Sequence, residues 1–236
     1  MKLQDAIPRG WVGVFVPDQP KIGLGLDIAT TEKQKSNPSA LAVTQYVAPL
    51  YFVRLLLSWK TADPNVTRAL VRYVLEGLPF EYKARKLCID ATSERFFAAE
   101  LKREFYSLVS VDLVVASEAT EYMGERMTFK QYLGNLAVNT MEDGQVALPN
   151  ERWLQKDFRL VVRDRGTFDC DVDEDGRHGD TFDAVKLSLH AITSKADEAY
   201  AAAVQVGSYG STEKHDPFSL RPDPNADDRP ASGPML

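Results

Sequence analysis

The order of strand-like and helical segments along the chain restricts the fold more than any other feature. Three apolar, strand-like segments come first, and two more follow, each after a helical segment. The predicted strands are Ile22–Asp27, Ala40–Val47, Tyr51–Trp59, Leu87–Asp90 and Val111–Val115, and the helices between the last three are 63–77 and 93–107. Helical crossovers join parallel strands, whereas short loops join antiparallel ones. We therefore expect an α/β fold with a mixed five-stranded sheet, made of three antiparallel strands and two βαβ crossovers, and helices on both faces.

Further helices are predicted behind the fifth strand. They span 121–140, 151–163 and 180–192, and an acidic, hairpin-like segment at 169–176 precedes the last one. The first twenty residues contain three prolines and look like an irregular lead-in. Residues 207–236 are polar and rich in proline, which is typical of a disordered tail. We therefore expect one folded domain over residues 1–206.

Composition limits the class of protein further. The chain has 236 residues, 44% of them hydrophobic, and no apolar run reaches the ~18 residues of a membrane span. Two cysteines, Cys88 and Cys170, are too few for a disulfide framework or a zinc site, which indicates a reducing compartment. The net charge of −6 argues against coating nucleic acid through bulk charge, but it leaves room for a local basic groove.

Aspartates end two predicted strands that the expected sheet places side by side. Asp27 ends the first strand and Asp90 ends the fourth. Asp180 and Asp183 lie three residues apart on the last helix and share one helical face. An aspartate after a strand is often only a turn former, and Asp180 has a further explanation as the anion at a helix start. Asp183 stands inside an otherwise apolar helix and has no such explanation.

These four carboxylates predict a metal site if the fold brings them together. A cluster of carboxylates is costly unless a cation neutralises it. Oxygen ligands without cysteine or clustered histidine select Mg²⁺ or Mn²⁺ over zinc. Two such ions, ~3.5–4 Å apart, can activate a water and stabilise the leaving 3′ oxygen of a phosphodiester.

Three stretches around the acids, in this order, resemble the motifs of the nuclease domain of phage large terminase subunits, with the Mu-like phages and prophages nearest. They are GLDIATTEKQKSNPSALAVTQ, LCIDATSERFFAAEL and RHGDTFDAVKLSLHAI, and EDGQVALPNERWLQKDFRLV resembles the region before the last motif. The resemblance spans residues 23–192. It implies an RNase H/RuvC-like fold and a metal-dependent endonuclease that cuts concatemeric viral DNA during capsid packaging.

The resemblance also assigns roles to the acids. It implies Asp27 and Asp90 as the first two metal ligands and Asp180 as the third. RuvC-type resolvases, which are related, carry two acids three residues apart at this place, so Asp183 is kept as a further ligand behind Asp180. The implied cofactors are two Mg²⁺ or Mn²⁺ ions.

One departure from the family is clear in the sequence. Full terminases carry an ATPase motor before the nuclease, but the phosphate-binding pattern G-x-x-x-x-G-K-[ST] occurs nowhere in this chain. We therefore expect a nuclease domain alone, either excised from a terminase or encoded by a truncated or split gene. The resemblance implies double-stranded DNA, bound without sequence specificity, as substrate. It implies the portal, the small terminase subunit and the terminase ATPase domain as partners, and the host-cell cytoplasm as location.

Basic side chains near the acids are candidate contacts for DNA phosphates. Lys33 and Lys35 lie in the loop after Asp27, Lys130 lies on a predicted helix, and His178 precedes the last acids. Such contacts follow the DNA backbone and read no bases. Each residue also has a plainer explanation as a solvated surface charge or a helix-start residue.

Two other functions stay open from the sequence. A RuvC-type resolvase or transposase core would keep the fold and the acids, but it would prefer four-way junctions to linear duplex. A nuclease-like domain that docks onto the packaging portal and cuts weakly would keep the fold without tight metal binding.

Overall fold

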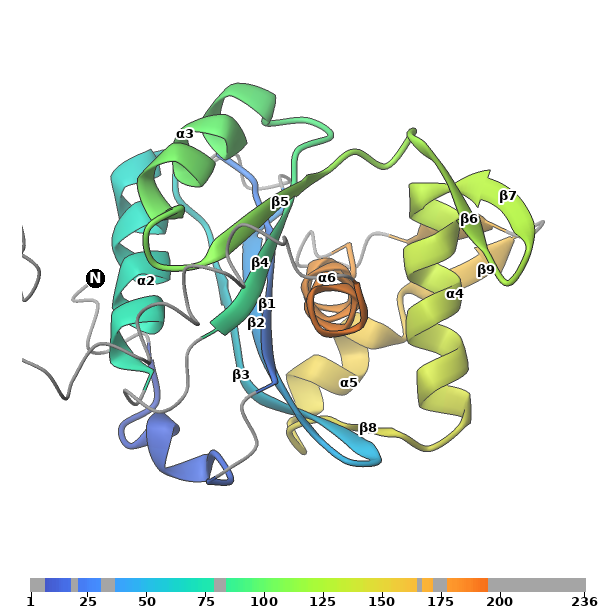
Figure 1. Ribbon diagram of the computed structural model, residues 1–236. Helices are drawn as coiled ribbons and strands as arrows, with labels where there is room; N and C mark the ends of the chain where they lie inside the picture. The colour runs from blue at the N-terminus through green and yellow to red at the C-terminus, as the bar shows by residue number, and fades with distance from the viewer. Residues whose placement is uncertain are drawn as a thin grey trace, which may run out of the picture. The chain divides into compact units, whose positions relative to one another are not determined.

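The computed structural model of the chain describes residues 7–17, 21–30, 37–78, 84–164, 167–171 and 178–194. Among these residues, one mixed sheet has six strands in the order β5-β4-β1-β2-β3-β8 (Figure 1). They are β1 (Ile22–Asp27), β2 (Ser39–Val47), β3 (Leu50–Trp59), β4 (Ala84–Asp90), β5 (Ser110–Val114) and β8 (Val146–Ala147). Strands β1 to β3 are antiparallel neighbours, and β4 and β5 continue the sheet parallel to β1. The predicted arrangement is confirmed, and the two-residue β8 adds a sixth strand, parallel to β3.

Helices cover both faces of this sheet, as predicted. Helices α2 (Pro64–Gly77) and α3 (Arg95–Phe105) lie on one side, and α4 (Phe129–Glu142), α5 (Arg152–Phe158) and α6 (Asp180–Thr193) lie on the other (Figure 1). Side chains alternate between the two faces along each strand. In β1, Leu24 and Leu26 are fully buried in the larger core with residues of α2 and α3. The residues between them are glycines, and these face α6.

Helix α6 packs against β1 more closely than a side chain on the strand would allow. A Cβ atom added to Gly25 would lie 2.1 Å from the carbonyl oxygen of Ala184, and one on Gly23 would lie 2.6 Å from that of Ser188. The first turn of α6 is held from α5, because the Asp157 carboxylate accepts hydrogen bonds from the backbone N–H (3.1 Å) and the hydroxyl of Thr181. The predicted helix 180–192 is confirmed.

The two crossover helices begin near the predicted positions. Asp63 caps α2 by accepting a hydrogen bond from the backbone N–H of Asn65 at 2.9 Å, and Pro64 occupies the first helical turn. Helix α3 is shorter than the predicted 93–107. It starts at Arg95, and the residue at its N-cap position is Glu94 rather than Ser93.

The predicted helix 121–140 is wrong in its first part. Residues Ala119–Tyr122 (β6) and Glu125–Thr128 (β7) form a hairpin instead, and both turn residues have positive φ angles, 54° at Met123 and 84° at Gly124. Helix α4 begins only after a capping box, in which Thr128 and Gln131 bond each other's backbone N–H. This T-x-x-Q pattern was the signal in the sequence for the true helix start.

The predicted helix 151–163 is also too long. Helix α5 ends at Phe158, and the chain turns into a second hairpin of β9 (Val161–Asp164) and β10 (Thr167–Cys170). Much of the hairpin-like segment predicted at 169–176 lies outside the described residues, as does the predicted tail at 207–236. The lead-in contains a short 3-10 helix, η1 (Trp11–Val14). Within the described part of the chain, no helix has the length and hydropathy needed to cross a bilayer.

Candidate metal centre

The parallel pairing of β1 and β4 brings two of the predicted acids to the same edge of the sheet. Leu26 pairs with Ile89, so Asp27 and Asp90, the next residue of each strand, end side by side. Both follow the alternation that puts Gly25 and Cys88 on the α6 side. Parallel strands in open α/β sheets present their carboxyl ends to one crevice, which is where ligands collect.

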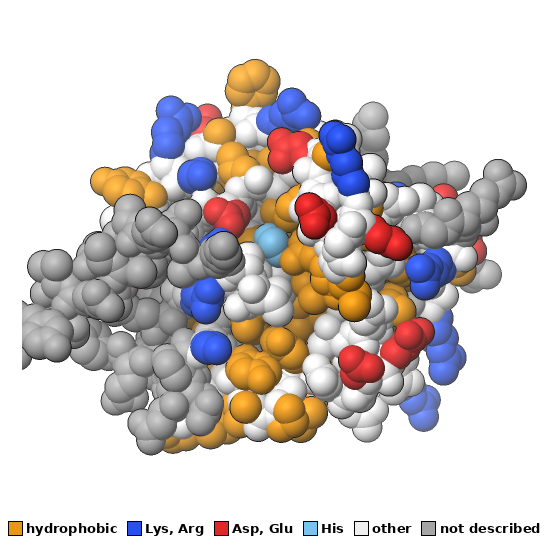
Figure 2. Space-filling view, turned by 45° about the vertical axis from the view of Figure 1, so that its right-hand side comes forward, with side chains coloured by type: hydrophobic (Ala, Val, Ile, Leu, Met, Phe, Trp, Pro, Cys, Tyr) orange, Lys and Arg blue, Asp and Glu red, His pale blue; other side chains and the backbone are white. Residues whose placement is uncertain are grey.

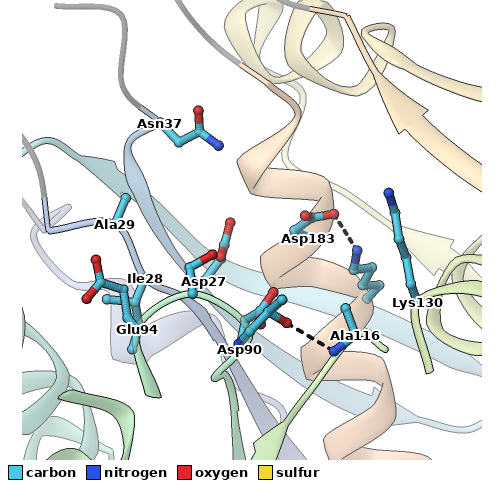
Figure 3. A pocket seen from close by; sticks show the side chains of 12 residues that line it. Asp27, Ile28, Ala29, Asn37, Asp90, Glu94, Ala116, Lys130 and Asp183 are labelled. Carbon is cyan, nitrogen blue, oxygen red and sulfur yellow. Dashed lines mark hydrogen bonds and ion pairs between the residues drawn. The ribbon is translucent and has the colours of Figure 1, made fainter. Parts of the chain in front are cut away.

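A pocket of about 490 Å³ opens at this edge, and Asp183 reaches it from the first turn of α6. Figure 3 shows the carboxylates of Asp27, Asp90 and Asp183 turned toward the same space. Gly25 makes this approach possible, because Ala184, the residue after Asp183, lies directly against it. The residues lining the pocket are Asp27, Ile28, Ala29, Asn37, Asp90, Thr92, Ser93, Glu94, Ala116, Lys130, Asp183 and Lys186.

The pKa of Asp27 reports how closely the acids converge. It is raised well above its usual value of 3.8, first by burial and then by the negative charges of Asp183, Asp90 and Asp180. The positive charge of Lys186 opposes this shift without cancelling it. A carboxylate so poorly compensated by the protein is one that a bound cation would stabilise.

Asp180, which the resemblance ranked as the third ligand, lies apart from the pocket lining. Its residue surface is only 2% exposed, whereas 37% of the Asp183 side chain is exposed. Burial raises the pKa of Asp180 to about 7, and the backbone N–H of His178, at 3.4 Å, lowers it in part. Asp183 is therefore the acid of this pair that faces the pocket, and Asp180 acts on it through its charge.

Lys186 is a pocket residue that the sequence analysis missed. It lies one turn after Asp183 on α6, only 7% exposed, and its Nζ atom is 2.6 Å from Oδ1 of Asp183. Burial lowers the pKa of Lys186, but the charges of Asp183, Asp27 and Asp90 outweigh it and raise the pKa overall. A lysine in the apolar run TFDAVKLSLHAI, three residues after an acid, was the available signal.

Two polar loops hold the other side of the pocket. Asp90 accepts a hydrogen bond from the backbone N–H of Thr92 at 2.8 Å, and the Thr92 hydroxyl accepts one from the N–H of Ala116 at 3.0 Å. Glu94, also missed in the sequence, accepts a hydrogen bond from the Thr30 hydroxyl at 2.6 Å. These bonds fix the orientation of Asp90 and Glu94 at the pocket rim.

The predicted phosphate contacts are placed unequally. Lys130 lines the pocket from the start of α4, and its side chain is exposed there (Figure 3). The described part of His178 supplies a backbone N–H to Asp180, and the residue is not in the pocket lining. Lys33 and Lys35 lie outside the described residues.

The pocket acids are spread more widely than the ligands of a single ion. No choice of one oxygen from each of Asp27, Asp90 and Asp183 puts all three within 4.8 Å of one another. Opposite oxygens around one Mg²⁺ are about 4.2 Å apart, since each Mg–O bond is about 2.1 Å. In this arrangement, one ion could not take an oxygen from all three acids, whereas two ions could share them.

Another group of possible ligands lies farther along the same face of the sheet. Atoms of Cys88, Asp112 and His190 lie within 4.8 Å of one another, a closeness that no other such triplet among the described residues reaches. Each polar partner is already engaged: Lys86 Nζ lies 2.6 Å from Asp112 Oδ2, and the Tyr132 hydroxyl lies 2.9 Å from His190 Nδ1. Burial raises the pKa of the Cys88 thiol, which keeps it protonated. This group is accounted for as a hydrogen-bonded polar cluster in the core.

Solved structures with this fold are known. The large terminase nuclease of the thermophilic phage G20c, determined with bound magnesium, aligns with a TM-score of 0.53 at 17% identity, over 74% of this chain and 82% of that chain. The full large terminase of another thermophilic bacteriophage, determined in complex with ADP, aligns with a TM-score of 0.52 at 12% identity over 81% of this chain. The alignment covers 44% of that second terminase. No family model and no curated protein sequence matches the chain. The likeness confirms the predicted RNase H-like fold.

Proposed function

We propose that this chain is the metal-dependent DNA endonuclease domain of a phage DNA-packaging terminase large subunit. The observation that carries the proposal is the convergence of Asp27, Asp90 and Asp183 on one pocket, at the sheet edge where β1 and β4 end together. The fold is shared with the G20c terminase nuclease, which binds magnesium. The motif resemblance to Mu-like phages and prophages supports a packaging nuclease of that type.

The donor set of the pocket fits hard divalent cations. All its acidic ligands are carboxylates, and the raised pKa of buried Asp27 means that the protein alone leaves this charge undercompensated. Oxygen donors of this kind select Mg²⁺ or Mn²⁺. Asp27 lies between the other two acids in the electrostatic sense, since both raise its pKa, and it is the ligand that two ions would share.

Phosphodiester hydrolysis at this pocket needs no protein nucleophile. When bound, two divalent ions activate the attacking water and stabilise the leaving 3′ oxygen. The chain's own residues hold the ligands in place: the Thr92 backbone orients Asp90, and Lys186 orients Asp183. Asp180 keeps negative charge behind the pocket without entering its lining.

Exposed Lys130 at the rim supplies a positive charge for a DNA phosphate. On the face shown in Figure 2, basic and acidic side chains are mixed, and no single basic stripe crosses the described part of it. This distribution favours a few local phosphate contacts over attraction by bulk charge. Phosphate contacts carry no base readout, so we infer cleavage of double-stranded DNA without sequence specificity.

In this proposal the motor activity resides elsewhere. The chain lacks the phosphate-binding pattern of a terminase ATPase, and it spans less than half of the ADP-bound large terminase that it matches. Its partners would then be a terminase ATPase domain, the portal and the small terminase subunit. Its substrate would be concatemeric viral DNA in the host cytoplasm.

Nicking of supercoiled plasmid tests the proposal. Asp27→Asn and Asp90→Asn, which keep side-chain size but remove the ligand charge, should each lower Mn²⁺-dependent nicking about 100-fold or more. Asp143→Asn is the matched control, because Asp143 is exposed at the end of α4, outside the pocket lining, and this variant should cut normally. Undiminished nicking by purified Asp27→Asn protein would overturn the assignment.

The same assay separates the two other candidate functions. Cleavage of four-way junctions far above that of linear duplex would favour a RuvC-type resolvase. A protein that binds no Mn²⁺ and cuts neither substrate, yet binds a portal ring, would be a docking domain. The buried, undercompensated Asp27 favours the metal-dependent enzyme over the docking domain.

A further inference from the structure

We propose that Lys186 is a built-in cation of the acidic pocket, which limits the DNA-free protein to one tightly bound divalent ion. This inference rests on the proposed function, since it concerns the metal content of the same site. It assigns Lys186 as a positioning residue that acts through Asp183.

The position of Lys186 is unusual for a lysine. It is 7% exposed, and its ammonium group is 2.6 Å from Oδ1 of Asp183. Lys130, the other lysine in the pocket lining, is exposed instead. A buried lysine is retained only when acids pair with it, and here the pocket acids do so.

The charges that line the pocket support a single ion. Four acids contribute −4, namely Asp27, Asp90, Glu94 and Asp183, and Lys130 and Lys186 contribute +2, which leaves −2. One divalent cation balances this charge. A second would leave the pocket at +2, and desolvated net charge of that size is costly without an added anion.

Geometry leads to the same conclusion as the charge. The ammonium of Lys186 occupies Oδ1 of Asp183, the acid that would hold the ion on the α6 side. Asp27 and Asp90, which end adjacent parallel strands, stay available as a pair. The first ion therefore binds between Asp27 and Asp90, while Lys186 supplies positive charge beside Asp183.

Calorimetric titration of the DNA-free full chain with Mn²⁺ alone tests this inference. The wild type should bind one ion. Lys186→Met, which keeps the length and apolar stem of the side chain, should bind Mn²⁺ about tenfold more tightly or take up a second ion. Lys186→Gln, which can still donate to Asp183 but carries no charge, should behave like Lys186→Met. Thermal unfolding of each variant establishes that it is folded.

Lys130→Met is the matched control for metal binding, because it removes the same charge from the exposed rim. Solvent screens that charge, so the Mn²⁺ affinity should change by about twofold or less. Two ions bound by the wild type, or unchanged affinity in both Lys186 variants, would overturn the role of Lys186 while leaving the nuclease assignment intact. No Mn²⁺ binding by the wild type or by either variant would overturn both.

Discussion

Asp180 and Asp183 lie three residues apart on α6 but have different environments. Asp183 lines the pocket, and Asp180 is buried behind it. Asp183→Asn should therefore reduce Mn²⁺-dependent nicking about 100-fold, while Asp180→Asn should reduce it about tenfold or less. Both variants are assayed at equal protein concentration on the same plasmid. A larger loss from Asp180→Asn than from Asp183→Asn would contradict the geometry and restore the order implied by the motif resemblance.

The raised pKa of Asp180 predicts how the metal-free protein responds to pH. Its value of about 7 exceeds the ordinary 3.8, so the folded state holds this proton more strongly than the unfolded state between these pH values. The free energy of unfolding contributed by Asp180 therefore falls as pH rises through that window. His190, with a pKa lowered to about 4 by burial, contributes the opposite slope, so the wild type alone does not isolate Asp180.

Comparison with Asp180→Asn isolates the effect of this carboxyl. In the presence of a chelator, the variant should have a higher Tm than the wild type at pH 8 and nearly the same Tm at pH 5, where Asp180 is protonated. Each pKa unit corresponds to roughly 1.4 kcal/mol. Equal Tm values at pH 8 would show that the carboxylate is not destabilised by its surroundings.

At the residue scale, the sequence predicted part of the site. Asp27 and Asp90 were found because each ends a strand, and parallel pairing of those strands places them together. The choice between Asp180 and Asp183 depends on how α6 is rotated against β1, which the spacing of three residues does not determine. Lys186 was missed because its importance comes from burial beside Asp183, and burial depends on tertiary packing.

The contact between α6 and β1 is the element that positions Asp183. Gly25→Ala would put a Cβ atom 2.1 Å from the Ala184 carbonyl oxygen, a backbone atom that cannot move without the helix. We expect a loss of about 3 kcal/mol or more in the free energy of unfolding, since overpacking of this kind is relieved only by shifting α6. Denaturant unfolding measures it, and the Mn²⁺ affinity should fall as well.

Gly13→Ala is the control for this prediction. Gly13 lies in η1, and an added Cβ atom there meets nothing within 4 Å. Its unfolding free energy should stay within about 0.5 kcal/mol of the wild type. A Gly25→Ala protein as stable as Gly13→Ala would show that α6 does not need this close approach.

Elements were predicted best where local signals and packing agree. Helix α6 and the strands β1 to β5 carry long apolar patterns, and their existence and order were confirmed. The helix predicted from residue 121 was wrong because Met123 and Gly124 adopt a turn with positive φ angles, and the capping box at Thr128 sets the real start. The two-residue β8 has too short a pattern for detection, because it exists only through its pairing with β3.

At the scale of the whole molecule, the order of elements carried more information than residue identity. The chain shares the fold of the G20c nuclease at 17% identity, so most side chains differ between the two. Strand order, crossovers and apolar faces depend on residue class, which survives such divergence. The metal site needs particular carboxylates at particular strand ends, and its details therefore required the three-dimensional arrangement.

The central claim is that Asp27, Asp90 and Asp183 surround a divalent-cation site at the ends of β1 and β4. Anomalous diffraction from crystals soaked in Mn²⁺ tests it most directly. We predict a peak about 2.0–2.3 Å from oxygens of Asp27 and Asp90, in the pocket that Asp183 and Lys186 close from α6. A pocket without Mn²⁺, or a peak ligated instead by Cys88, Asp112 and His190, would contradict the account.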